Sequence, residues 1–416
     1  MKGVVAQILA GGAGERLYPL TKNRAKPAVP FGGIYRIIDF TLSNCINSGV
    51  RRIHVLAQHE SLSLARHIRL GWGLLRSEFG EYIEVVPPQK RVGTGWYLGT
   101  ADAVYQNISS LERDRPTEVL ILAGDHVYKM DYSGMVAFHR DMEADLTIPC
   151  VEVGIEDARR FGVINVDENN RIVNFEEKPD NPTPSSDRAD TYLASMGIYV
   201  FRSEVLNDVL VEDSELPSSS HDFGNDIVPG MVESHRVFAY NFRNNREGLM
   251  PYWRDIGTVD AYWEANMDLV AVTPSFNLYE PAWPVRTYQP HHPPAKFVFA
   301  DVGERCGAAL DSIVSQGCII SGGMARNCVF SPSVRVNSYA DLEKSILFEG
   351  AEVGRHCRIR NAIVSEGVRI PRRAVIGYDL EKDAKRHFVT PGGVVVVQRE
   401  DFGSEEGASG DWRDDS

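Results

Sequence analysis

Long apolar runs are missing from this sequence of 416 residues. No stretch approaches the ~20 consecutive apolar residues that a membrane-spanning helix needs, so we expect no membrane association. The first predicted strand begins almost at Met1 and leaves no room for a signal peptide. Both absences favour a soluble protein of the cytoplasm.

Paired cysteines and an excess of basic residues are missing as well. The six cysteines form no C-x-x-C pair and no zinc-like spacing, which indicates reduced, mostly buried thiols. The 44 basic and 57 acidic side chains give a net charge of −13. Because general nucleic-acid binding needs a basic surface, we expect no nucleic-acid partner. The length and the 43% of hydrophobic residues allow two domains with full cores.

A short apolar run followed by a glycine turn opens the chain. Residues 4–9 are rich in β-branched side chains and predict a central parallel strand. The glycines within residues 10–14 let the backbone turn tightly and point several N–H groups at one anion. Arg16 and Lys26 follow with the positive charge that a polyphosphate needs. The stretch is neither a Walker A loop nor a G-x-G-x-x-G motif, so it predicts either another kind of triphosphate cradle or an ordinary strand-to-loop turn.

Predicted strands and helices alternate in the first part of the chain. Apolar runs indicate strands at 52–57 and 119–123, and helical spacing indicates helices at 38–46, 61–69 and 100–108. Such alternation implies a mostly parallel sheet with helices on both faces. Ligands bind beyond the carboxyl ends of the strands in such sheets. We therefore expect the glycine turn and Asp125 at the same edge of the sheet.

The C-terminal third has a different pattern, in which apolar residues recur at intervals of six. Examples are Ile313 with Ile319, and the series Val364, Ile370 and Ile376. This spacing is the mark of a parallel β-helix, in which each coil stacks its aliphatic side chain on the previous one. A few irregular antiparallel strands are the alternative. We expect a first domain at 1–272, a proline-rich linker at 273–299, a β-helix at 300–400 and a disordered acidic tail at 401–416.

Longer strings near the N-terminus resemble a known enzyme family. LAGGAGERL at 9–17 and RAKPAV at 24–29 are similar to the signature of sugar-1-phosphate nucleotidylyltransferases. FGGIYRIIDF at 31–40 is more specific and resembles bacterial ADP-glucose pyrophosphorylases (glucose-1-phosphate adenylyltransferases). The resemblance extends over about residues 4–397. It implies an α/β protein with a Rossmann-like mixed-sheet nucleotidyltransferase domain, followed by a C-terminal left-handed parallel β-helix.

The resemblance also implies a reaction. AMP would pass from ATP to α-D-glucose 1-phosphate, giving ADP-glucose and pyrophosphate in the first committed step of glycogen biosynthesis. A phosphate monoester is mostly dianionic at pH 7, with a second pKa of ~6, so the attacking group needs no general base. Catalysis then depends on holding two anions together and neutralising charge on the leaving group. We expect a site rich in cations, with Mg²⁺ bound by carboxylates.

Site residues follow from the residues themselves and from the resemblance. The catalytic residues would be Arg16, Lys26 and Asp125, and Asp125 would share the Mg²⁺ ion with Asp255. The resemblance places the nucleotide on Leu9, Ala10, Gly11, Gly12, Gly14, Gln89 and Gly124. It places glucose 1-phosphate on Tyr97, Gly162, Glu177, Lys178, Ser195 and Asp222. Taken alone, Asp125 could be a turn carboxylate, Asp255 a helix cap and Lys178 a solvated surface charge.

Departures from the family pattern concern regulation. Enteric members carry a lysine, implicated in binding fructose 1,6-bisphosphate, where this chain has Asn23. Lost cations weaken such a bisphosphate site. The remaining Arg24, Arg36 and Arg113 predict an anionic allosteric effector of altered specificity. The resemblance assigns Gln58 and Trp96 to communication between the regulatory and substrate sites, and it implies a homotetramer.

Other functions stay open at this point. The same fold could transfer a nucleotide from UTP, GTP or dTTP. The chain could also be a non-catalytic regulatory subunit, although such chains are expected to lose charged site groups that are present here. A β-helix acyltransferase is a weaker alternative, because no catalytic histidine stands out among the repeats.

Overall fold

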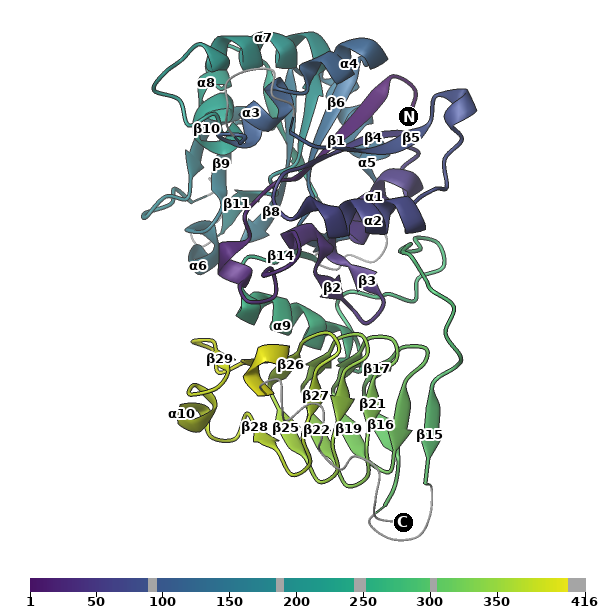
Figure 1. Ribbon diagram of the computed structural model, residues 1–416. Coiled ribbons are helices and arrows are strands. Elements are labelled where there is room, and N and C mark those ends of the chain that lie inside the picture. The colour runs from purple at the N-terminus through teal and green to yellow at the C-terminus, as the bar shows by residue number, and fades with distance from the viewer. Residues whose placement is uncertain (89–95, 185–190, 243–251, 300–304, 403–416) are drawn as a thin grey trace. The chain divides into compact units, whose positions relative to one another are not determined.

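The computed structural model describes residues 1–88, 96–184, 191–242, 252–299 and 305–402 (Figure 1). These residues form two compact units. The first unit comprises residues 1–13 and 40–253, and the second comprises residues 14–39 and the chain from 254 onward. Among the described helices, none is long and apolar enough to cross a membrane.

A mixed sheet, ten-stranded in its described part, forms the centre of the first unit. Four parallel strands come first, β1 (Val4–Ala10), β4 (Arg52–Ala57), β5 (Tyr82–Val86) and β6 (Glu118–Ala123). The other strands are β8 (Leu146–Val153), β9 (Gly162–Val166), β10 (Ile172–Glu177), β11 (Tyr192–Ser195), β12 (Tyr199–Arg202) and β13 (Val237–Asn241). Most of these pair antiparallel, so the sheet is mixed, as the resemblance implied.

Helices cover both faces of this sheet. Leu111 and Leu206 pack with Val5 and Ile121 in one hydrophobic core. That core lies under α3 (Thr100–Tyr105), α4 (Ile108–Asp114) and α7 (Ser203–Ser214). The remaining long helices of the unit are α1 (Ile37–Asn47), α2 (Ser61–Gly71) and α5 (Tyr132–Asp141). The predicted strands at 52–57 and 119–123 and the helix at 38–46 are confirmed.

The second unit contains three parallel ladders of short strands. One ladder comprises β15 (Lys296–Val298), β18 (Ile319–Ser321), β21 (Arg335–Val336), β24 (Glu352–Val353) and β27 (Arg369–Ile370). The next comprises β16 (Ala308–Leu310), β19 (Met324–Arg326), β22 (Asp341–Glu343), β25 (Arg358–Arg360) and β28 (Val375–Ile376). The third comprises β17 (Ile313–Val314), β20 (Val329–Phe330), β23 (Ile346–Leu347), β26 (Ala362–Val364) and β30 (Val395–Val397), with β29 (Phe388–Val389) antiparallel at its end. This arrangement confirms the predicted parallel β-helix.

A residue with positive φ recurs at one corner of successive coils of the β-helix. Tyr339, His356 and Arg373 follow one another at intervals of 17 residues, and all three have positive φ. A left-handed residue lets the chain turn sharply between two strands of one coil. Isoleucine, valine and leucine side chains fill the interior, as the six-residue spacing predicts.

Two segments from outside the predicted β-helix range belong to the second unit. The backbone amide of Gly32 donates to Oδ1 of Asn266 in α9 (Val259–Leu269), at 2.9 Å. The indole of Trp263 in turn donates to the carbonyl oxygen of Lys344 in the β-helix, also at 2.9 Å. Residues 14–39 and α9 therefore pack with the β-helix, although the expected division assigned both to 1–272. The strand β15 also begins inside the expected linker at 273–299. The boundaries of the domains stay predictions.

Candidate functional site

The carboxyl ends of β1, β4 and β6 meet at one edge of the sheet in the first unit. A Cβ atom added to Gly11 would lie 3.2 Å from Cβ of Gln58 and 3.8 Å from the ring of Tyr97. The amide of Gly124 donates to the carbonyl oxygen of Leu9 at 3.0 Å. An added Cβ at Gly12 would have no neighbour within 4 Å among the residues that the structure describes. The structure thus brings the glycine turn, with Ala10 at its start, beside Gln58, Tyr97 and Gly124.

Tyr97 is hydrogen-bonded through both its backbone amide and its hydroxyl group. Its backbone amide donates to Oε1 of Gln58 at 2.8 Å, and its hydroxyl accepts from Nδ2 of Asn107 at 2.9 Å. Burial raises the pKa of this tyrosine. The preceding Trp96 stacks on the ring of His59, with centroids 4.6 Å apart. Sequence reasoning did not single out His59 or Asn107, because their role depends on contacts between distant segments.

A second group of predicted residues converges on two glycines. A Cβ at Gly162 would lie 2.9 Å from Oε2 of Glu177, and a Cβ at Gly224 would lie 2.7 Å from the same oxygen. The Cβ at Gly224 would also lie 3.4 Å from Oδ1 of Asp222. The two carboxylates therefore lie against the same glycine. A ring with several hydroxyl groups offers donors to such a pair of carboxylates.

Tyr199 belongs to this group, although it was not among the predicted residues. Burial raises its pKa, with further contributions from the charges of Glu177 and Asp222, and Ser195 hydrogen-bonds to it. The hydroxyl of Ser195 also accepts from the amide of Gly197 at 3.2 Å. Nothing in the local sequence pattern distinguished Tyr199, at the start of β12, from a core tyrosine.

Lys178 follows Glu177 in an uncommon backbone conformation. Its φ is 46°, in the left-handed region, and its ammonium group lies 2.6 Å from Oε1 of Glu177. The side chain is 60% exposed, so an incoming anion can reach it. Strained backbone of this kind is concentrated at ligand-binding sites.

Asp125 is the second residue after the end of β6, and its side chain is partly exposed. The neighbouring His126 is buried and packs edge-on against Trp253, with ring centroids 5.3 Å apart. A Cβ at Gly197 would lie 3.7 Å from Cε1 of the same histidine. His126 therefore connects the strand end that carries Asp125 with the turn after Ser195.

The second unit carries the other charged residues of the predicted site. Gly14 has a φ of 67°, and its carbonyl oxygen accepts from the hydroxyl of Thr21 at 2.9 Å. An added Cβ at Gly14 would lie 3.3 Å from Cβ of Lys26. The ammonium group of Lys26 lies 3.4 Å from Oδ1 of Asp255, and Arg16 is exposed to solvent. The second unit thus supplies two cations, Arg16 and Lys26, and one carboxylate, Asp255.

Two family models match the chain. The nucleotidyl transferase model matches residues 5–271, and the model of the GlmU-like C-terminal hexapeptide matches residues 293–397. A relative from Koribacter versatilis is 55% identical over 397 residues, which is 94% of both chains. Relatives from Methylococcus capsulatus and Rhodopirellula baltica are 53% and 54% identical, and the alignments cover 94% and 96% of this chain and 92% and 90% of theirs. All three are named glucose-1-phosphate adenylyltransferase. The chain belongs to the glucose-1-phosphate adenylyltransferase family.

The hexapeptide match, together with the three parallel ladders, confirms the left-handed β-helix. Nucleotidyltransferases of this kind typically use a divalent metal ion. Among the described residues, no group of three or more histidine, cysteine or carboxylate side chains could hold a metal. The carboxylates of Asp125 in the first unit and of Asp255 in the second are 30% and 20% exposed, and carboxylate oxygens are ligands of the kind that Mg²⁺ takes in proteins.

The predicted regulatory arginines of this adenylyltransferase-family chain lie in both units. In the second unit, the guanidinium of Arg24 pairs with Oε2 of Glu366 at 2.9 Å. Arg36 donates to the carbonyl oxygen of Ala28, and burial, followed by the nearby charge of Arg24, lowers its pKa. In the first unit, Arg113 lies 3.6 Å from Glu84 at an exposed position. Gln89 lies outside the described residues.

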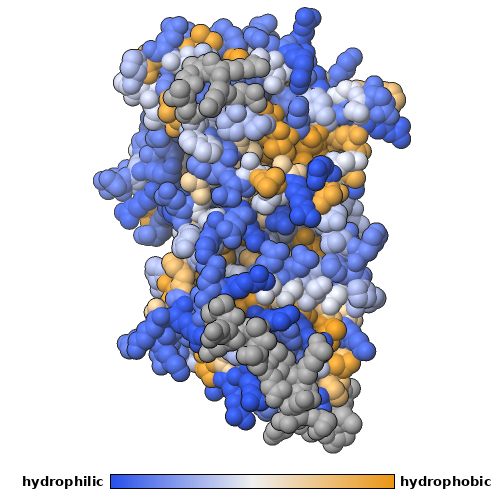
Figure 2. Space-filling view, viewed as in Figure 1, coloured by the Kyte–Doolittle hydropathy of each residue, from blue (hydrophilic) through white to orange (hydrophobic). Residues whose placement is uncertain are grey.

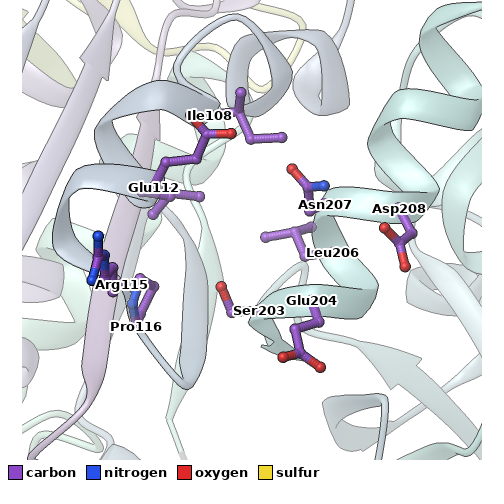
Figure 3. Close-up of a pocket in the computed structure, with 10 residues that line it drawn as sticks. Ile108, Glu112, Arg115, Pro116, Ser203, Glu204, Leu206, Asn207 and Asp208 are labelled. Atoms are coloured by element: carbon purple, nitrogen blue, oxygen red, sulfur yellow. The ribbon is translucent and has the colours of Figure 1, made fainter.

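A pocket of about 360 Å³ lies between α4 and α7 in the first unit. Figure 3 shows Glu112 and Arg115 on the α4 side, opposite Leu206 and Asn207 of α7. None of the predicted site residues that the structure describes lines this pocket. On the face drawn in Figure 2, hydrophilic side chains predominate and apolar ones form scattered patches.

Proposed function

We propose that this protein transfers AMP from ATP to α-D-glucose 1-phosphate, with ADP-glucose and pyrophosphate as products. The observation that carries the proposal is the identity of 50–55% over at least 94% of the chain with relatives named glucose-1-phosphate adenylyltransferase. The predicted charged residues Arg16, Lys26, Asp125, Lys178 and Asp255 are all present, which favours catalysis over a purely regulatory role. The product would serve glycogen biosynthesis.

The sugar half of the reaction is assigned to the group of residues around Gly224. Asp222 and Glu177 accept hydrogen bonds from the glucose hydroxyls, and Gly162, which has no side chain, lets Glu177 lie close against its backbone at this site. Tyr97 and Ser195 complete the contacts. The ammonium group of Lys178 binds the phosphate, whose charge attracts it away from Glu177.

The nucleotide half is assigned to the glycine turn. Leu9, Ala10, Gly11, Gly12, Gly14 and Gly124 bring backbone close to the nucleotide, with Gln89 at the base. A phosphate oxygen of glucose 1-phosphate attacks the α-phosphorus of ATP in line, and pyrophosphate leaves. Arg16 and Lys26 neutralise charge on the leaving group, and this electrostatic term is the main contribution we assign to the protein.

Mg²⁺ would be held by Asp125 and Asp255 together with phosphate oxygens. When bound, the ion supplies positive charge to the phosphates at the reacting centre. The carboxylate oxygens of Asp125 and Asp255 suit this hard cation better than sulfur or imidazole ligands would. The ammonium group of Lys26, 3.4 Å from Oδ1 of Asp255, orients that carboxylate.

Regulation is assigned to Arg24, Arg36 and Arg113, which would bind an anionic effector. Arg24 is already paired with Glu366, so an effector phosphate would compete with that carboxylate. Gln58 and Trp96 would transmit the effect, since both hold the segment that carries Tyr97. A homotetramer in the cytoplasm, without nucleic-acid or membrane partners, completes the proposal.

The test is pyrophosphate release by the purified protein with Mg²⁺ and glucose 1-phosphate, in parallel with ATP, UTP, GTP and dTTP. Turnover with ATP alone would support the proposal. Turnover with another nucleotide would replace the product but keep the reaction class. Absence of turnover with all four, with and without sugar phosphates, pyruvate or AMP as effectors, would favour the regulatory subunit.

A further inference from the structure

A histidine in a left-handed backbone conformation lies one residue before Asp222. The φ of His221 is 56°, in the region that residues other than glycine adopt uncommonly. Such a conformation persists where the surrounding structure over-determines it. The contacts of His221 therefore show what the fold holds in place at this point.

One buried carboxylate holds His221 by its side chain and by its backbone. Nδ1 of His221 lies 2.7 Å from Oδ2 of Asp213, in the last turn of α7, and the two side chains are only 14% and 8% exposed. Oδ1 of Asp213 accepts from the hydroxyl of Ser219 at 2.6 Å. The oxygen of that hydroxyl accepts from the backbone amide of His221 at 2.9 Å. Both oxygens of Asp213 are thus used to fix one residue.

The carbonyl group of His221 in turn holds the start of α3. It accepts from the amides of Ala101 and Asp102 at 2.8 and 3.3 Å, and these amides have no acceptor within the helix. A Cβ atom at Gly99 would lie only 2.2 Å from the same carbonyl oxygen, so the two backbones approach closely. The hydroxyl of Thr100 adds a second link, since it donates to Oδ2 of Asp222 at 2.9 Å.

Asp222 is oriented by the same segment. Its Oδ1 accepts from the amides of Gly224 and Asn225 at 2.9 and 3.1 Å, which caps the short π-helical turn Phe223–Ile227. Gly224 is also the residue against which Glu177 lies. A rotation of the backbone at His221 would therefore move both carboxylates relative to each other.

We propose that His221 and Asp213 are positioning residues that hold Asp222 and Glu177 in the geometry that binds the sugar of glucose 1-phosphate. The inference rests on the proposed function and adds two residues that touch neither substrate. Their effect is specific to the sugar half of the reaction, because the segment they hold carries none of the residues assigned to the nucleotide.

Three substitutions of His221 separate its side-chain bond from its backbone conformation. His221→Gly permits positive φ but removes the bond to Asp213. His221→Asn tolerates positive φ and offers Nδ2 as a donor at the position of Nδ1. His221→Ala loses the bond and disfavours the conformation.

The KM for glucose 1-phosphate is expected to rise roughly tenfold in His221→Gly, the order that loss of a hydrogen bond to a charged group implies. It should rise further in His221→Ala and stay within about twofold of the parent in His221→Asn, because the donor is restored. The KM for ATP should stay unchanged in all three. An equal rise for both substrates, or no rescue by asparagine, would overturn the proposal.

Glu143 provides a matched control in the same unit. It also has a positive φ, of 45°, and its carboxylate pairs with Arg236 at 3.0 Å on the surface. Glu143→Gly removes a charged side-chain contact at a left-handed position, and it should leave both KM values unchanged. If His221→Gly does not fold, Asp213→Asn removes one of the two acceptors and should raise the KM for glucose 1-phosphate alone.

Hydrogen exchange of the Ala101 amide tests the network without an assay of activity. Exchange should be faster in His221→Gly than in the parent and in His221→Asn. If the parent protein makes no ADP-glucose, the proposed function fails, and the exchange rates still report whether His221 holds α3. Equal exchange in parent and glycine variant would overturn the positioning role.

Discussion

The ammonium nitrogen of Lys26 lies 3.4 Å from Oδ1 of Asp255, and both side chains are mostly shielded from solvent. We expect Lys26→Met to lower kcat by about 100-fold or more, because the substitution removes a preorganised positive charge that stabilises the leaving pyrophosphate. Pyrophosphate release measures this loss, and circular dichroism checks that the fold is retained. Lys22→Met, which breaks an exposed pair with Glu400, is the control and should keep the parent kcat. A Lys26→Met enzyme with near-parent turnover would contradict the assignment.

Asp125→Asn should lower turnover by at least about 100-fold, since charge stabilisation by a bound metal amounts to several kcal/mol. The substitution preserves volume, so the melting temperature should stay close to that of the parent. Titration with Mg²⁺ should show weaker activation in any residual activity. If the variant keeps the parent's turnover and Mg²⁺ dependence, Asp125 does not bind the metal.

Lys178→Ala should raise the KM for glucose 1-phosphate by roughly tenfold or more, because a charge-assisted hydrogen bond to phosphate is lost. The KM for ATP should change little. Initial rates at varied concentrations of each substrate measure both values. A parallel rise in the two constants would place the lysine elsewhere.

Glu366→Gln should strengthen binding of an anionic effector, because it releases Arg24 from the ion pair. The pair is partly exposed, so we expect the half-saturating effector concentration to fall by only about two- to fivefold. Basal activity without effector should stay the same. Asp341→Asn breaks another exposed ion pair of the β-helix, with Arg326, and serves as control. Equal shifts in both variants would argue against a specific role for Arg24.

Acid destabilises the first unit partly through His139. Burial lowers the pKa of His139 from 6.5 to about 4, and its Nδ1 lies 2.9 Å from the hydroxyl of Thr147. Below pH 6.5 the imidazole of His139 binds a proton in the unfolded chain but stays neutral in the folded chain. The free energy of unfolding is therefore fully retained above pH 6.5 and decreases as the pH falls towards 4. His139→Gln should show a shallower decline of melting temperature over this interval. His235→Gln, at a partly exposed site, is the control and should follow the parent. Parallel curves for all three proteins would contradict the prediction.

Short-range patterns were enough to predict the first parallel strands, several helices and the repeat of the β-helix. Side chains of a strand or helix repeat with a fixed period, so the strand before the glycine turn and the helix α1 could be read directly. The helix expected at 100–108 is interrupted. Asn107 uses its side chain to bond the carbonyl oxygen of Ala103 and the hydroxyl of Tyr97, and a second helix begins at Ile108. Tyr97 lies ten residues before Asn107, so a periodic pattern does not predict this contact.

The amino-acid sequence by itself determined the glycine turn, the hexapeptide coils and the chemical types of the charged site residues. These features depend on residue identity and on spacings of a few positions. Only the tertiary structure decided that Glu177, Asp222 and Tyr199 meet around Gly224, and that His221 is tied to Asp213. The meeting around Gly224 depends on strand order and register in the mixed sheet, which bring together residues tens of positions apart. The bond between His221 and Asp213 spans eight residues and depends on the course of the chain after α7, which no periodic pattern describes.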